Sequence, residues 1–172
     1  MEGSFMADLL HYSRNRCTSV EQLDETTLKS TCRLQDTLTD ARVEITVRLP
    51  DLEITGVSGH VRRTYQEECR NAADALEKVI GVRIGAGMLK IIKGLVREET
   101  DCGQLGFMVE ECCHGVILAF TKETLVTTPR PKEIEEAKRF YQDMVKKNVR
   151  LYNRCAAFAP GSSMVEGITP LE

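Results

Sequence analysis

Residues 42–49 alternate strictly between polar and apolar side chains, and this alternation constrains the fold more than any other feature of the chain. The apolar positions are Val43, Ile45, Val47 and Leu49. Because successive side chains of a β-strand point to opposite faces of a sheet, the period of two predicts a strand with one buried and one solvent-facing side. The chain is therefore expected to build a sheet that is covered on one face.

Two neighbouring segments show weaker forms of the same pattern. Residues 27–34 alternate with Cys32 on the apolar side, and residues 54–61 alternate irregularly around two glycines, which suggests a bulge. Since the connections are short, the three strands are expected to form an antiparallel meander within residues 27–63. The preceding residues 1–26 show no clear period and are interpreted as an N-terminal segment.

After the third predicted strand, the apolar residues recur at helical spacing. The four predicted helices have their apolar stripes within residues 72–80, 88–96, 105–120 and 134–152. Residues 68–155 are therefore expected to form a helical part, followed by a tail over residues 160–172. Strands first and helices afterwards are typical of the α+β class, with helices on one face of an antiparallel sheet. A length of 172 residues fits a single domain.

The charges of the chain are nearly balanced, with 23 Lys and Arg against 26 Asp and Glu. Because no basic block is present and aromatic residues make up only 5% of the chain, we expect no nucleic-acid partner. No run of about 20 apolar residues occurs, so no membrane span is expected. The start of the chain lacks the pattern of a secretory leader, which favours a cytoplasmic protein with reduced thiols.

Seven cysteines are the unusual feature of the composition. Cys69 and Cys102 each stand near the start of a predicted helix, where free N–H groups and the helix dipole stabilise a thiolate. Asp36 and Asp40, before the second predicted strand, could add oxygen ligands if their loop folds over the helix starts. Two thiolates and a carboxylate are a plausible ligand set for zinc or iron. The spacing along the chain does not show whether these residues meet.

The third predicted helix carries further candidates. Glu110 and His114 are four residues apart and share a helix face, which suits either a metal or an ordinary surface ion pair. Cys112 and Cys113 project about 100° apart, so one of them is expected to be partly exposed and reactive. No spacing favours a catalytic Ser/His/Asp or Cys/His arrangement, and the sequence leaves open whether the chain is an enzyme.

Several motifs together resemble a bacterial family catalogued as domain of unknown function 2889. The resemblance covers roughly residues 28–165 and is carried by residues 38–45, 51–57 and 63–69, the turn at 79–87, the helix start at 101–105 and the segment 153–157. The sequence departs from the family at Gln104, where the family usually has His, and at Tyr65, where it often has Pro. The family has no established activity, so the resemblance implies the fold and singles out Gln104.

A weaker likeness at the level of the fold links the chain to iron–sulfur scaffold proteins of the NifU type. Both combine a carboxylate loop, two antiparallel strands and cysteines at two helix starts. This likeness implies that Asp36 or Asp40, together with Cys69 and Cys102, binds zinc or a nascent cluster. Since one fold hosts many functions, the implication rests on analogy.

The sequence thus supports three hypotheses. The first is a non-enzymatic accessory protein that binds a metal or presents thiolates at Cys69 and Cys102. The second is a small-molecule-binding protein or enzyme with a pocket between sheet and helices, near Cys102 or Glu110 and His114. The third is a protein-interaction domain with structural cysteines, for which a protein partner or a homodimer is possible. Cys17 and Cys155 lie in segments whose structure the pattern does not predict.

Overall fold

A computed structural model describes residues 11–65, 73–85, 87–97, 103–127, 131–147, 149–153 and 155–168. The chain divides into two compact units, Met1–Phe120 and Thr121–Glu172. The first unit contains a sheet with helices and the second contains helices alone, so the predicted α+β class is confirmed. Within the described ranges, none of the helices combines the length and the apolar character needed to cross a membrane.

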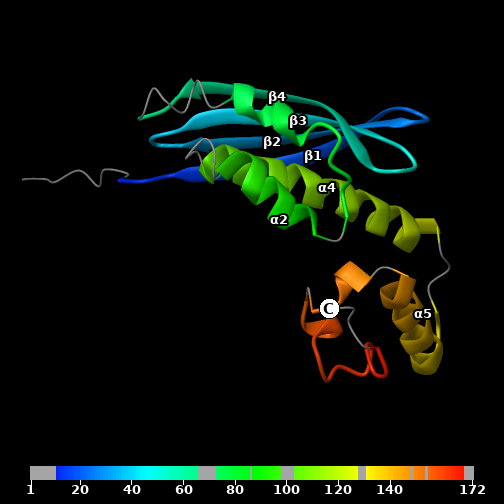
Figure 1. The fold of residues 1–172 in the computed structure, drawn as a ribbon. Helices are drawn as coiled ribbons and strands as arrows, with labels where there is room; N and C mark the ends of the chain where they lie inside the picture. The colour runs from blue at the N-terminus through cyan, green and yellow to red at the C-terminus, as the bar shows by residue number, and fades with distance from the viewer. Residues whose placement is uncertain are drawn as a thin grey trace, which may run out of the picture. The chain divides into compact units, whose positions relative to one another are not determined.

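The sheet of the first unit has four antiparallel strands, one more than predicted. They follow each other in chain order (Figure 1) as β1 (Arg14–Asp24), β2 (Thr27–Asp36), β3 (Asp40–Arg48) and β4 (Glu53–Arg63). The three predicted strands correspond to β2, β3 and β4, and the register between β3 and β4 shifts twice, in agreement with the expected irregularity.

Helices cover one face of this sheet, as Figure 1 shows for α2 (Met88–Ile92) and α4 (Gly103–Thr127). The first predicted helix is only a 3-10 helix, η1 (Asp74–Val79), which packs on β4. There Gly59 allows a close approach, because a Cβ at this position would lie 2.6 Å from Leu76 Cδ1. After α2 the chain continues as a π-helix, η2 (Lys93–Arg97).

The core lies between the sheet and these helices. The alternation that defines β3 places Val43, Ile45 and Val47 in the core and leaves the polar residues on the outer face. From the opposite side the core is closed by α4, whose buried apolar side chains are Leu105, Met108, Val109, Cys112, Cys113 and Val116. The predicted apolar face of the sheet is therefore confirmed.

The additional strand is β1, which lies within residues 1–26, where the sequence pattern predicts no strand. This strand has few apolar residues because it lies at the edge of the sheet and is exposed over most of its length. On its inner side, the Arg16 guanidinium lies 4.6 Å from the ring centroid of Phe107 on α4. Long basic side chains can cover apolar surface with their aliphatic stems. β1 can therefore pack on α4 although β1 itself has no apolar stripe.

The second unit is built around α5 (Ile134–Lys147), followed by the 3-10 helices η3 (Val149–Leu151) and η4 (Ala156–Phe158). The fourth helix predicted from the sequence corresponds to α5. It ends at Lys147, whereas the apolar stripe extends to residue 152. Met144 and Val145 are buried, and the rings of Tyr141 and Phe158 have centroids 6.1 Å apart.

Candidate functional site

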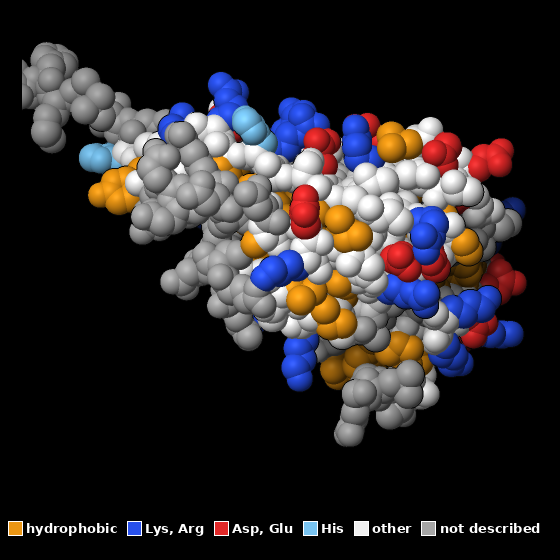
Figure 2. All heavy atoms as spheres, turned by 45° about the horizontal axis from the view of Figure 1, so that its top comes forward, with side chains coloured by type: hydrophobic (Ala, Val, Ile, Leu, Met, Phe, Trp, Pro, Cys, Tyr) orange, Lys and Arg blue, Asp and Glu red, His pale blue; other side chains and the backbone are white. Residues whose placement is uncertain are grey.

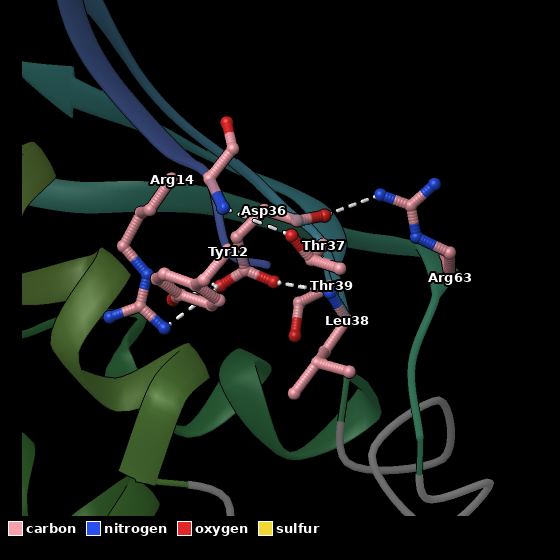
Figure 3. A network of polar contacts seen from close by, with 8 residues as sticks. Tyr12, Arg14, Asp36, Thr37, Leu38, Thr39 and Arg63 are labelled. Atoms are coloured by element: carbon pink, nitrogen blue, oxygen red, sulfur yellow. Dashed lines mark hydrogen bonds and ion pairs between the residues drawn. The ribbon is translucent and has the colours of Figure 1, made fainter. Parts of the chain in front are cut away.

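The predicted ligand Asp36 lies at the end of β2, where its carboxylate closes the turn to β3 (Figure 3). Oδ1 accepts hydrogen bonds from the backbone N–H groups of Leu38, at 2.9 Å, and Thr39, at 2.6 Å. This is the local pattern by which an Asp side chain stabilises a turn. The chain folds this way because Asp36 can serve two successive N–H groups that the strands leave unpaired.

The second carboxylate oxygen joins the turn to β1. Asp36 Oδ2 accepts hydrogen bonds from Arg14 Nε at 3.0 Å, from Arg14 Nη2 at 2.8 Å and from the Tyr12 hydroxyl at 3.2 Å. The Arg63 guanidinium at the end of β4 donates to the main-chain oxygen of Asp36. Figure 3 shows Tyr12 and Arg14 at the carboxylate and Arg63 at the main-chain oxygen. The arrangement therefore ties β1, β2 and β4 together at one end of the sheet.

The electrostatics of Asp36 follow from these contacts. Only 1% of its side chain is exposed, and the desolvation that accompanies burial pushes its pKa upward. The hydrogen bonds from Arg14, from the Thr39 and Leu38 backbone and from Tyr12 outweigh this effect and hold the pKa below its ordinary value. Asp36 is therefore an ionised, fully hydrogen-bonded group, and a metal at Oδ2 would have to displace Arg14.

Within the described residues, the structure does not assemble the other predicted metal ligands into a site. Asp40 begins β3, and its Oδ2 lies 3.8 Å from Arg62 Nη1 on β4. Cys69 and Cys102 lie outside the described residues, so a shared metal at these thiols stays a prediction. In the ranges that the structure describes, no group of three or more His, Cys, Asp or Glu side chains could hold a metal ion.

Three described cysteines are buried in the core: Cys32 on β2, and Cys112 and Cys113 on α4. Burial raises the pKa of Cys32, raises that of Cys112 further, and raises the pKa of Cys113 to about 12. The expectation that Cys112 or Cys113 is partly exposed and reactive was wrong. Both thiols are completely buried, so the buried arc of α4 is wider than a single stripe.

The remaining candidates lie on α4 as predicted. His114 Nδ1 is 3.9 Å from Glu111 Oε1, three residues earlier, whereas Oε1 of Glu110 is buried without a hydrogen-bond partner among the described residues. The Glu110 charge also contributes to the raised pKa of Cys113. Gln104 is half-buried near the start of the helix. These positions give no assembled catalytic group in the described part of the chain.

The outer face of the sheet carries charges of both signs. The strand register aligns Cys17, Arg33, Arg42 and His60 in one row across the four strands. Arg42 in this row is paired, because its Nη2 lies 2.6 Å from Glu44 Oε1. Figure 2 shows basic and acidic side chains interspersed over the face that it presents. Among the described residues, this face therefore carries charges of both signs rather than one.

Sequence reasoning missed the open edge of β1. In the part of the chain that the structure describes, β1 pairs with β2 and with no other strand. Its apolar content gives no strand signal, but its charges are segregated, with Arg14 and Arg16 in the first half and Glu21 and Asp24 in the second. That segregation is the one signal in the sequence that could have drawn attention to this segment.

Comparisons with known proteins leave the question of family open. No family model, no curated protein and no solved structure matches the chain. The resemblances to the bacterial domain of unknown function 2889 and to NifU-type proteins therefore stay predictions from the motifs. The features that bear on function are therefore those of the chain itself. They are the hydrogen-bonded turn at Asp36, the buried thiols of the core, and the edge of β1 that pairs with no described strand.

Proposed function

We propose that the first unit is a protein-interaction domain that pairs the open edge of β1 with an extended segment of a partner protein. One observation carries this proposal, namely that β1 is an edge strand of 11 residues with one neighbour among the described strands. An edge strand presents a row of unpaired N–H and C=O groups that can accept another strand. β1 contains neither Pro nor Lys, two residues by which proteins commonly block such edges.

The opposite edge of the sheet differs from β1. Next to the start of β4, Gly81 and Ile84 donate backbone hydrogen bonds to Ile54 and Leu52 at 2.8 and 2.9 Å. Residues 81–84 thus occupy part of that edge, and the two register shifts with β3 interrupt its regularity. Covering and bulging are two ways in which proteins protect an edge strand. The contrast favours β1 as the edge that is left open for a partner.

The chemistry of the described cysteines also supports an interaction domain. Cys32, Cys112 and Cys113 are buried thiols whose pKa values are raised by burial, so they are protonated at neutral pH. A protonated, inaccessible thiol neither attacks a substrate nor binds a metal. These side chains act as small apolar residues in the core, which is the role that the third hypothesis assigned to them.

The charge pattern of β1 indicates which strand would pair best. Opposite charges on directly facing strands stabilise a sheet, and like charges destabilise it, by roughly 0.2–1 kcal/mol per pair. An antiparallel partner strand should therefore place an acidic end beside Arg14 and Arg16, and a basic or neutral end beside Glu21. A parallel partner strand would need the reverse order of charges along its sequence.

A synthetic peptide that copies residues 12–24 tests the proposal, since its own charges have the required antiparallel order. The measurement is hydrogen exchange of the full chain with the peptide in large excess. We expect slower exchange at the β1 amides, with no change at β3. A control peptide in which the Arg and the acidic residues exchange positions should protect β1 less. If the β1 amides exchange rapidly without peptide and neither peptide slows them, the proposal is overturned.

Proline substitutions provide a second test. Consecutive backbone N–H groups of a strand point to opposite sides, so one of Thr18 and Ser19 donates toward β2 and the other toward the open edge. Thr18→Pro and Ser19→Pro should therefore differ: one variant destabilises the sheet, and the other keeps its stability but loses the peptide. If both variants fold normally and bind the peptide, β1 is not the binding edge.

A further inference from the structure

We infer that the strand paired with β1 is β1 of a second copy of this chain, so that two sheets join into one eight-stranded sheet across a two-fold axis. This inference rests on the proposed function of the β1 edge and names its partner. Most soluble homo-oligomers are closed and symmetric, and a two-fold dimer uses the same surface patch on both copies. An open edge strand is such a patch when its sequence is complementary to itself in the antiparallel direction.

Symmetry fixes how the two strands face each other. Antiparallel strands can pair across a two-fold axis only if the axis is perpendicular to the sheet, and such an axis keeps both helical layers on the same side. β1 is regular from Arg14 to Gln22, and its pairing with β2 shifts register between Gln22 and Asp24. Pairing this whole regular part with its copy places Thr18 on the axis. Cys17 then faces Ser19 of the second copy.

The charges of β1 are compatible with this register. Arg14 faces Gln22 of the second copy, Asn15 faces its Glu21, and Arg16 faces its Val20. No two like charges are therefore directly opposite, and the basic end of each strand lies beside the acidic end of the other. The Asn15 amide can donate to the facing Glu21 carboxylate, and the two-fold symmetry makes this contact occur twice in the dimer. The strand is thus complementary to itself when antiparallel.

The helix beneath β1 offers a second, independent observation. Three residues of α4 define the flank below β1: Phe107 and Glu111 contact Arg16, and a Cβ at Gly115 would lie 2.9 Å from Thr18 Cγ2. Leu118 follows Gly115 by three residues and so belongs to the same flank. Its exposed fraction is 64%, which is high for a leucine.

The two-fold axis would bring these two flanks toward each other. Since Gly115 contacts Thr18, and Thr18 lies on the axis, each Leu118 is within about one helical turn of it along α4. Both helical layers lie on the same side of the joined sheet, so the two leucines can cover each other. The same dimer would therefore pair the open edge of β1 and bury the exposed Leu118 side chain.

A disulfide formed under mild oxidation tests the register in the full chain. Directly facing residues of antiparallel strands have Cα atoms about 4.5–5.5 Å apart, within the range that a disulfide requires. In Ser19→Cys, the new thiol faces the native Cys17 of the second copy, and we expect a covalent dimer linked between positions 17 and 19. Peptide mapping under non-reducing conditions identifies the link. Glu21→Cys, on the same outer face, is the matched control and should not form it.

The oligomeric state of the full chain, measured by analytical ultracentrifugation over a dilution series, tests the interface itself. We expect a dimer, and we expect Leu118→Arg to raise its dissociation constant at least tenfold by placing two cations near the axis. Ile91→Arg is the control, because Ile91 is a similarly exposed apolar residue on α2. A chain that is monomeric at all concentrations overturns the inference. So does a dimer whose dissociation constant is unchanged by Leu118→Arg and which forms no link between positions 17 and 19 in Ser19→Cys.

These outcomes can be distinguished from failure of the proposed function. If Leu118→Arg is monomeric and its β1 amides are protected by the peptide that copies β1, both proposals are supported. If the native chain is monomeric but the peptide protects β1, the edge binds strands and the second copy is the wrong partner. If neither self-association nor peptide protection occurs, the edge proposal and the dimer are both overturned.

Discussion

The Ser30 hydroxyl on β2 donates a 2.9 Å hydrogen bond to the main-chain oxygen of Cys112, in the middle of α4. This bond joins two elements that are 82 residues apart, and both residues are completely buried. A hydroxyl in an apolar core must find an acceptor, and here it finds one on the helix that closes the core. The position of α4 beneath β2 is therefore set by a polar contact as well as by apolar packing.

Ser30→Ala should lower the free energy of unfolding by about 1 kcal/mol, the typical net value of one such hydrogen bond. The loss is modest because the substitution removes the donor and leaves no buried hydroxyl behind. Urea denaturation measures it, and Ser58→Ala, at an exposed position on β4, is the control. A loss at Ser58 as large as that at Ser30 would contradict the role assigned to the bond.

Gly115→Ala should destabilise the first unit by about 1–3 kcal/mol, the usual cost of overpacking a core. The added methyl would lie 2.9 Å from Thr18 Cγ2 and 3.2 Å from Val20 Cγ2, so α4 would have to move away from β1. Gly94→Ala is the matched control, because a Cβ there meets nothing within 4 Å. Thermal unfolding of the two variants should therefore separate clearly, and equal midpoints would argue against the close packing of α4 on β1.

Acid should destabilise the sheet through Asp36. Its pKa is held below the ordinary value in the folded chain, so its contribution to stability is complete above the unfolded pKa, near 3.9. The contribution is lost as the pH falls through the lower, folded pKa. Asp36→Asn should lower the free energy of unfolding at pH 7 and flatten its dependence on pH below about 4. Asp40 Oδ2 lies 3.8 Å from Arg62 Nη1, a longer contact than that between Asp36 and Arg14. Asp40→Asn should therefore change the loss of stability at low pH less than Asp36→Asn does.

The thiols should divide into two classes toward a thiol reagent at pH 8. Cys17 and Cys155 are exposed and should react at once, whereas Cys32, Cys112 and Cys113 should react only on unfolding. The raised pKa values of the buried thiols also predict a loss of stability in base. That contribution is complete below the unfolded pKa, near 8.5, and falls as the pH rises beyond it. Rapid labelling of Cys112 in the folded chain would contradict its burial.

Much of the sheet could be predicted because β2, β3 and β4 bury one face, and burial imposes an alternating pattern on the sequence. β1 could not be predicted this way, because an edge strand that packs on α4 through Arg16 needs no apolar stripe. The helical spacing of Leu105, Val109 and Val116 located α4, whereas η1 shares a similar apolar spacing and is a 3-10 helix. Local periodicity does not separate those two outcomes, since tertiary packing decides them.

The candidate site was less predictable than the fold. The sequence singled out Asp36 for its carboxylate, but its donors come from β1 and from the turn after β2, and such a set depends on tertiary contacts. The same limit applies to Cys112 and Cys113. Their 100° separation on a helix implies one exposed thiol only if the buried face is a single narrow stripe, and the buried face of α4 encloses both thiols.

The contact between Arg16 and Phe107 has a consequence for the behaviour of the chain in crowded solution. Segments that assemble into amyloid are apolar, weakly charged and rich in β-formers. β1 keeps its place in the sheet while carrying four charged side chains among 11 residues, because a guanidinium covers the helix where an aliphatic side chain would otherwise stand. An accessible pairing edge and resistance to indiscriminate fibril growth can therefore coexist in the same strand.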